Sequence, residues 1–204
     1  EADFLISFEM LEAARWLPYL KKDGVVVTST QQINPMPVIM GVKEYPEDMI
    51  FLAQINFAEI PNNTELPKEG ILQFFVKDDD SYGLFAEDGF KVIFHENPGA
   101  SVEVELHEAD YSPILQSGRI VFHKRTEPMS YSDFRFPVEI DNSVIANEDL
   151  DGSGSKVLGY PFFTQYDPRE IKGDSYDTLL FQLDSDDSFV MWGDVGVANF
   201  FINK

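Results

Sequence analysis

Short runs of apolar residues separated by turn residues recur from about residue 49 to the end of the chain. The clearest runs, 51–57 and 70–76, are rich in Phe, Ile and Leu. Residues 101–107 alternate apolar and polar side chains, which is typical of a strand with one face in solvent. These patterns predict a fold that is rich in β-strands. Further strands are expected at 91–95, 119–123, 136–140 and 156–163, and a hairpin is expected within 179–202.

The first 48 residues follow a different pattern. Residues 3–8 form a short apolar run, residues 9–20 place apolar side chains at helical spacing, and residues 25–27 are three valines. This order predicts a strand, a helix and a second strand, which together form a βαβ unit with parallel strands. Such a unit normally needs further strands beside it and helices on both faces.

Two stretches of the β-rich part resemble one another. Gln54 is followed by Gly70 and a Phe-Phe pair, and Gln182 is followed by Gly196 and another Phe-Phe pair. The similar spacing indicates two copies of one β-unit. Chance similarity is the alternative, because the chain contains 18 Phe. We therefore expect an α+β fold, predominantly antiparallel β with a duplicated β-unit, plus an N-terminal βαβ fragment.

The charge of the chain restricts its partners. There are 36 Asp and Glu against 15 Lys and Arg, and the formal net charge of -21 repels nucleic acid and anionic membranes. No apolar run reaches the roughly 18–20 residues that span a bilayer. The chain has no Cys, which excludes disulfides and thiolate metal sites. Because Glu1 and Asp3 stand where a signal peptide is basic, we expect a cytoplasmic protein, although a chain without Cys is also compatible with export.

Several long motifs resemble one known family. The motifs FLAQINFAEIP, LPKEGILQFFVKDDD, KVLGYPFFTQYDPR and LLFQLDSDDSFVMWGDVGVANFFI closely resemble the YwqG-like family, bacterial proteins with a domain of unknown function. The resemblance covers about residues 49–204. It implies a further N-terminal region with a Gly-Gly-x-Pro-x-x-Pro motif, which is missing here, and a short segment after the final strand.

Residues 1–48 resemble a different family. The motifs EMLEAARWLPYLKKDG and QQINPMPV are similar to an internal piece of the gamma-type domain of 2-oxoacid:ferredoxin oxidoreductases, as in the indolepyruvate oxidoreductase beta subunit. Those enzymes use thiamine diphosphate, iron-sulfur clusters and coenzyme A, but this chain has no Cys to hold a cluster. We therefore expect no oxidoreductase activity. The chain is interpreted as a composite of two truncated families, 1–48 and 49–204, joined near residues 46–50.

One acidic loop has the spacing of a calcium site. Asn147, Asp149, Asp151 and Ser155 match ligand positions of an EF-hand loop. The position of the bidentate Glu is Leu158, and no amphipathic helices flank the loop. We expect a flexible acidic connector here, with calcium binding as the alternative, and we expect no other cofactor.

A second acidic cluster lies in the C-terminal hairpin. Asp184, Asp186, Asp187 and Asp194 would form a site for a hard cation if the hairpin brought them together. A metal-assisted or hydrolase-like enzyme is therefore one alternative function. The favoured interpretation is a connecting turn whose carboxylates cap their own backbone.

Arg169 follows an Asp-Pro pair, Asp167-Pro168, in which the Asp is held extended. Arg169 is therefore placed to pair with a carboxylate through two hydrogen bonds, and this structural salt bridge is favoured over an anion-binding role. Gln54 and Gln182 lie mid-strand among apolar neighbours. Each is expected to clamp neighbouring backbone, or both line a polar cleft.

The function that these patterns favour is non-catalytic binding of a protein, a peptide or a small polar ligand in a polar cleft between the two β-units. Trp192 is expected in the core or in the wall of that cleft. A composite with no function of its own is a further alternative. The candidate cleft residues are Gln54, Gln165, Asp167, Arg169, Gln182, Asp184, Trp192 and Asp194.

Overall fold

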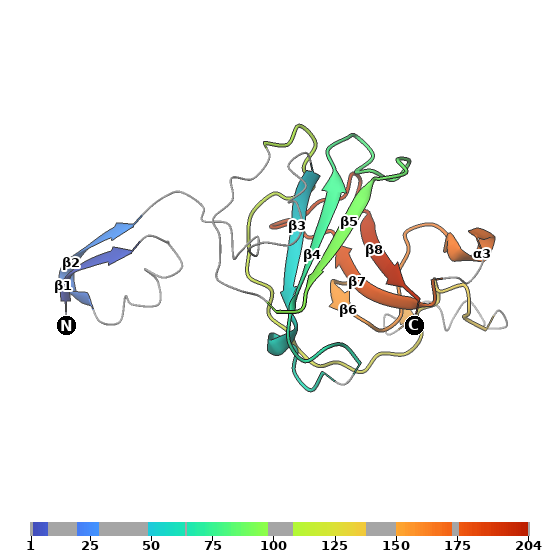
Figure 1. The fold of residues 1–204 in the computed structure, drawn as a ribbon, viewed down its shortest axis with the longest axis horizontal. Helices are drawn as coiled ribbons and strands as arrows, with labels where there is room; N and C mark the ends of the chain where they lie inside the picture. Colours follow the sequence, from blue (N-terminus) through green and yellow to red (C-terminus); the bar gives the residue numbers. More distant parts are fainter. Residues whose placement is uncertain are drawn as a thin grey trace.

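Strands and extended loops make up almost all of the described part of the computed structural model (Figure 1). Within the described residues, the regular helices are one 3-10 turn, η2 (Phe57–Glu59), and the short helix α3 (Arg169–Lys172). The described residues are thus mostly antiparallel β with little helix, so the expected α+β class is not confirmed. The structure describes residues 2–7, 20–28, 49–63, 65–97, 108–137, 150–172 and 176–203.

Two N-terminal strands, β1 (Ala2–Ser7) and β2 (Leu20–Thr28), pair in parallel, as the strands of a βαβ unit would. The helix expected over residues 9–20 lies outside the described residues except at its last position. That position, Leu20, begins β2. The βαβ prediction is therefore confirmed only for its pair of parallel strands.

The first of two larger sheets contains β3 (Met49–Asn56), β4 (Ile71–Lys77) and β5 (Phe90–His95), antiparallel in that order. These strands lie where the sequence predicts them, at 51–57, 70–76 and 91–95. Strand β3 ends because the Asn56 side chain accepts a hydrogen bond from the backbone N–H of Ala58 and caps η2.

The second larger sheet contains β6 (Lys156–Val157), β7 (Thr178–Asp184) and β8 (Val197–Ile202), antiparallel in the order β6-β7-β8. The strand expected over 156–163 is therefore much shorter than predicted. It ends at Val157, because the next residue, Leu158, has a φ of 63°, a left-handed conformation that interrupts an extended strand.

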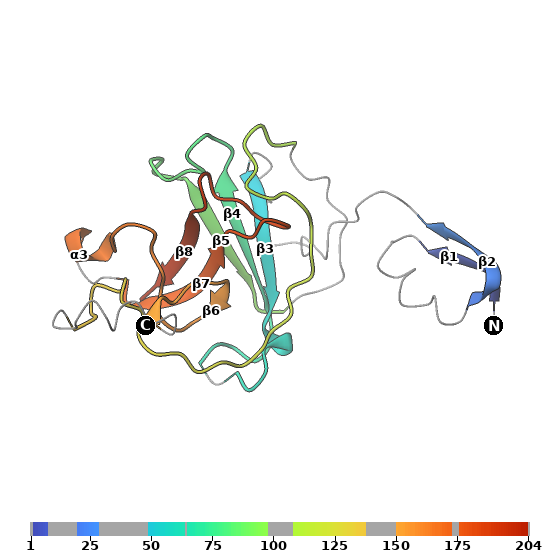
Figure 2. The same cartoon turned by 180° about the vertical axis from the view of Figure 1, so that it is seen from behind.

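The strand expected over 119–123 is absent, because that described segment has no ladder of hydrogen bonds. Its alternating pattern has another cause: Ile120 and Phe122 pack against the core, and their neighbours Arg119, Val121 and His123 are exposed. Figure 2 shows residues 108–137 passing along the β3 side of the molecule. Residues 136–137 are also outside any strand, and the predicted strand positions 101–107 and 138–140 lie outside the described residues.

The two hairpins β3-β4 and β7-β8 share the position of an irregularity. The register shifts between Phe51 and Ala53 in β3, and it shifts between Leu179 and Phe181 in β7. In each hairpin the shift lies just before the mid-strand Gln. A β-bulge of this kind bends and twists the strand, so both hairpins have the same local distortion.

The two hairpins also share their register but not their third strand. Gln54 lies opposite Gln73, and Gln182 lies opposite Asn199. The third strand of the first sheet, β5, pairs with β4, whereas the third strand of the second sheet, β6, pairs with β7. In the described chain, β8 therefore has no strand on the edge where its counterpart β4 has β5.

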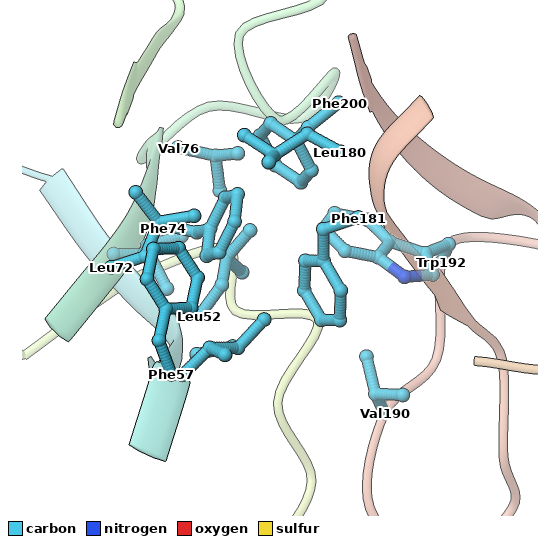
Figure 3. Packing of buried hydrophobic residues seen from close by; sticks show 13 residues of the cluster. Leu52, Phe57, Leu72, Phe74, Val76, Leu180, Phe181, Val190, Trp192 and Phe200 are labelled. Atoms are coloured by element: carbon cyan, nitrogen blue, oxygen red, sulfur yellow. The ribbon is translucent and has the colours of Figure 1, made fainter. Parts of the chain in front are cut away.

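The core lies between the two larger sheets. The ring of Phe74 on β4 lies 4.7 Å from Phe181 and 4.9 Å from Phe200, centroid to centroid (Figure 3). These facing surfaces are packed with apolar side chains, so the expected polar cleft does not lie between them. The buried cluster consists of Ile50, Leu52, Ala53, Ile55, Phe57, Leu72, Phe74, Val76, Leu180, Phe181, Val190, Trp192 and Phe200.

Candidate functional site

Two Asp-x-Arg turns form the most polar buried site of the described residues. In the first, the backbone N–H and Nε of Arg135 donate to Asp133 Oδ1 over 2.9 and 2.8 Å. In the second, the same groups of Arg169 donate to Asp167 Oδ1 over 3.0 and 2.9 Å. Each Asp therefore fixes its own turn and orients the Arg two residues later.

The two turns are joined to each other. Arg169 Nη2 donates to Asp133 Oδ2 over 3.0 Å, and the backbone N–H of Phe134 donates to Asp167 Oδ2 over 3.1 Å. Asp133, Asp167 and Arg169 are 2%, 3% and 5% exposed. These charged side chains can be buried because they are paired and hydrogen-bonded. Removing one charged partner would leave an unpaired charge in the interior.

Aromatic rings surround the Arg169 guanidinium. Its central carbon lies 4.5 Å from the ring centre of Phe201 on β8, 5.0 Å from that of Phe134 and 5.9 Å from that of Phe163. Its third nitrogen, Nη1, donates to the backbone oxygen of Tyr176. The structural salt bridge expected for Arg169 is thus present, and each of the three guanidinium nitrogens donates to a group of the protein.

The charge network sets the ionisation of Asp133. Burial is the largest single influence and acts to raise its pKa, but hydrogen bonds from the Arg135 side chain and backbone and from Arg169 together outweigh it. The pKa of Asp133 is therefore held below its usual range. The same carboxylate raises the pKa of the Arg135 guanidinium through its side-chain hydrogen bonds.

The lowered pKa predicts a loss of stability in acid. Asp133 contributes stability that is complete above its unfolded pKa, about 4, and that is lost as the pH falls through the lower folded pKa. In Arg135→Gln the depression is weaker, so acidification below about pH 4 should cost the variant less stability than it costs the wild type. Urea unfolding over a series of pH values measures both curves, and parallel curves would contradict the assignment.

Gln182 clamps a loop onto the second sheet. Its Oε1 accepts the backbone N–H of Phe162 over 2.7 Å, and its Nε2 donates to the backbone oxygens of Gly152 and Gly154 over 3.1 and 2.7 Å. The side chain is fully buried, at 0% exposure. The clamp expected from the sequence is confirmed for this Gln.

Gln54 forms its hydrogen bond with a side chain and not with the backbone, unlike the clamp that the sequence predicts. Its Oε1 accepts Gln73 Nε2 over 2.8 Å, and Gln73 Oε1 lies 3.0 Å from His95 Nε2. These residues form a row across β3, β4 and β5. Gln54 therefore lies in a polar row on the first sheet, separate from Gln182 on the second sheet.

Two of the four carboxylates of the C-terminal hairpin cap backbone, and the other two, Asp187 and Asp194, are exposed. Asp184 accepts the N–H groups of Gly154 and Ser185 over 2.6 and 2.9 Å, and Asp186 accepts those of Ser188 and Phe189. Within the ranges that the structure describes, no three His, Asp or Glu side chains gather as ligands for a metal ion. The arrangement is that of a connecting turn.

The EF-hand-like loop is described only in its second half. Asp151 accepts the backbone N–H and the hydroxyl of Ser153 over 2.6 and 2.9 Å, and Ser155 Oγ accepts the backbone N–H of Asp184 over 3.0 Å. Asn147 and Asp149 lie outside the described residues. The described half thus serves the local backbone.

Trp192 lies in the core at 8% exposure. Its ring meets the ring of Tyr82 edge-on, with 5.3 Å between centroids. Its Nε1 is buried without a hydrogen-bond partner among the described residues. Trp192 therefore fastens the β7-β8 connection to the β4-β5 connection, where Tyr82 lies.

The β4-β5 connection displays two large apolar side chains that sequence reasoning missed. Leu84 and Phe85 are 77% and 87% exposed. The loop is braced from inside, because Asp79 Oδ1 accepts the backbone N–H and hydroxyl of Ser81 and the N–H of Gly83 over 2.9, 2.7 and 2.9 Å. The Gly83 bond and then the Ser81 hydroxyl bond lower the pKa of Asp79 most strongly.

The base of this loop is closed by glycines. Gly83 has a φ of 78°, and a Cβ on either Gly83 or Gly89 would overlap the backbone carbonyl of the other. Tyr82 has a φ of 53°, and its ring is held against Trp192. We call residues 78–89 the Leu84–Phe85 loop, and these contacts leave no room for a side chain at Gly83 or Gly89.

Comparison with known proteins places this structure in a family. The model of a domain of unknown function, DUF1963, matches residues 17–204. The chain belongs to this family. The match confirms the YwqG-like resemblance and begins earlier than residue 49. Whether 1–48 and 49–204 are separate domains stays a prediction.

Part of this DUF1963 chain is also similar to curated oxidoreductase subunits. Indolepyruvate oxidoreductase subunit IorB of Thermococcus kodakarensis and that of Pyrococcus horikoshii are each 48% identical over 46 residues. The similarity covers 22% of this chain, which spans only 23% of those relatives. It agrees with the resemblance seen in residues 1–48.

The predicted site residues of the DUF1963 chain do not form one site. Asp167 and Arg169 lie together in the charge network, and Gln182 and Asp184 both bind the backbone of Gly154. Gln54 lies on the other sheet, and Trp192 lies in the core. Gln165 and Asp194 are exposed. No helix in the described residues is long and apolar enough to cross a membrane.

Proposed function

We propose that this DUF1963 protein is a non-catalytic binding protein whose contact surface is the Leu84–Phe85 loop. The observation that carries the proposal is the exposure of these two side chains, 77% and 87%, on a loop that is braced by the Asp79 hydrogen bonds and by the close approach of Gly83 and Gly89. Most polar residues that sequence reasoning selected are occupied by hydrogen bonds within the protein. They support the fold, and the proposal assigns them no catalytic role and no cofactor.

Large apolar side chains on a rigid support are typical anchors of protein interfaces. Because the Asp79 hydrogen bonds already brace the loop, we expect a low cost in conformational entropy when the loop binds a partner. Exposed Asp80, Glu87 and Asp88 flank the anchors. The proposed partner is therefore a protein or peptide with an apolar pocket edged by Lys or Arg, in the cytoplasm. The proposal gives residues 1–48 no oxidoreductase activity.

The double variant Leu84→Ser/Phe85→Ser should abolish capture of this partner and leave the melting temperature unchanged, because neither side chain is buried. Affinity purification from the source cells with quantitative mass spectrometry measures capture. Val121→Ser is the control, since Val121 is 65% exposed on another segment. Equal capture by the double variant and the control would contradict the proposal. Capture of nothing by the wild type would favour a composite with no function of its own.

A further inference from the structure

The two hairpins indicate what belongs on the open edge of β8. Their shared register and bulge position mark β8 as the counterpart of β4. The outer edge of β4 pairs with β5, from Val76 opposite Phe90 to Ile71 opposite His95. The outer edge of β8 has no strand in the part of the chain that the structure describes. Such an edge presents backbone N–H and C=O groups that favour pairing with another strand.

A second observation comes from β5. Phe90 and Phe94 lie opposite Val76 and Leu72, which belong to the core cluster, so they are on the face of the first sheet that is turned toward the second. Yet these two side chains are 64% and 40% exposed. Val92, which lies between them on the same face, is half-buried and packs against the core. The inner face of the first sheet is therefore only partly covered at β5, where the Phe90 and Phe94 rings remain in solvent.

The ring contacts place this partly covered face beside the β8 edge. Phe74 on β4 contacts rings on both β7 and β8, whereas Phe90 on β5 contacts Phe200 of β8, with 6.2 Å between centroids. The direction from β4 to β5 in the first sheet is thus the direction from β7 to β8 in the second sheet. Strand β5 therefore lies toward the outer edge of β8. Figure 1 shows β5 and β8 next to each other on this side.

We propose that the outer edge of β8 binds an extended peptide, antiparallel to β8, in the position that β5 occupies on β4. The peptide adds a strand through main-chain hydrogen bonds, and its alternate apolar side chains cover Phe90 and Phe94. This surface uses side chains other than Leu84 and Phe85, so the inference goes beyond the proposed function.

Charge selects the chemistry of the peptide. With a net charge of -21 on each chain, a second copy of this protein would be repelled from the edge, whereas lysine or arginine at the outward positions of a peptide would be attracted. The occupant is therefore an extended peptide in which large apolar residues alternate with basic ones. Strand β5 itself, FKVIFH, has Phe, Val and Phe at the positions that face the second sheet.

The test uses the full chain and the synthetic peptide KKFKVIFHKK, which copies β5 between lysines, with a fluorescent label. Anisotropy should show one peptide bound per chain, and Phe90→Ala should weaken binding at least about tenfold. Tyr166→Ala is the matched control, because Tyr166 is 61% exposed, and it should leave the affinity unchanged. Two further peptides are N-methylated at alternate amides, one at the odd positions and the other at the even positions. Only one of the two should lose binding, since a strand on an open sheet edge donates hydrogen bonds from alternate residues.

Three results would overturn the inference: no binding below about 1 mM peptide, equal binding by wild type and Phe90→Ala, or equal binding by both N-methylated peptides. Sedimentation that shows a dimer of the chain, dissociated by the peptide, would assign the edge to a second copy instead. Each of these failures leaves the Leu84–Phe85 loop proposal untouched, because that surface is tested with other residues.

Discussion

Replacing Arg169 by methionine should lower the free energy of unfolding by about 3–5 kcal/mol. The guanidinium is 5% exposed and donates to both Asp167 and Asp133. Methionine fills much of its volume among the aromatic rings but leaves two buried carboxylates without their shared cation. The loss should therefore come from unpaired charge rather than from a cavity. Urea unfolding at pH 7 measures it.

An exposed ion pair provides the control for this variant. Arg119 lies 3.5 Å from Glu59, and the two side chains are 58% and 46% exposed. Arg119→Met should change the stability by less than about 1 kcal/mol, because solvent screens the pair. If Arg169→Met were as mild as Arg119→Met, the buried network would not hold the loops to the second sheet.

Replacing Phe74 by alanine should also lower the free energy of unfolding by about 3–5 kcal/mol, because its ring is fully buried and its removal leaves a cavity in the core. Phe74 packs between Phe181 and Phe200, so the variant separates the two larger sheets at their centre. Thermal and urea unfolding measure the loss. Phe85→Ala, at a side chain 87% exposed, should stay within about 0.5 kcal/mol of wild type. A similar cost for both variants would contradict the position of the core.

Local pattern predicted those strands whose apolar runs are bounded by turns. The runs 51–57 and 70–76 became β3 and β4, because Asn56 caps the first and aspartates follow the second. The alternation at 119–123 was misleading, since a segment can bury every second side chain against a core without pairing its backbone. A segment becomes a β-strand only if the fold places another strand beside it, and a short run of alternating residues does not show whether such a strand is present.

The candidate site was predictable where a residue acts on its own surroundings. The bonds of Gln182 and the turn at Asp167 and Arg169 follow from burial of a polar group and from the Asp-Pro pair. Asp133 was missed because the fold brings it to Arg169 from a distant part of the sequence. The repeated Asp-x-Arg pattern at 133–135 and 167–169 is a signal that could have found it.

Leu84 and Phe85 were missed for a different reason. Composition treats every Phe and Leu as a candidate for the core, and only the fold shows which of them stay in solvent. Their display depends on the Asp79 hydrogen bonds and on the contact between Gly83 and Gly89, which are features of a turn rather than of a binding motif.

The most direct test of the account is photocrosslinking from the Leu84–Phe85 loop. A benzophenone amino acid is placed at position 85 in one protein and at position 121 in another, and both are expressed in the source cells. Both positions are exposed, but position 85 alone lies in the proposed surface. We expect a discrete crosslinked partner from position 85, absent from position 121 and lost when Leu84→Ser is added. No crosslink from position 85, or the same products from both positions, would contradict this expectation.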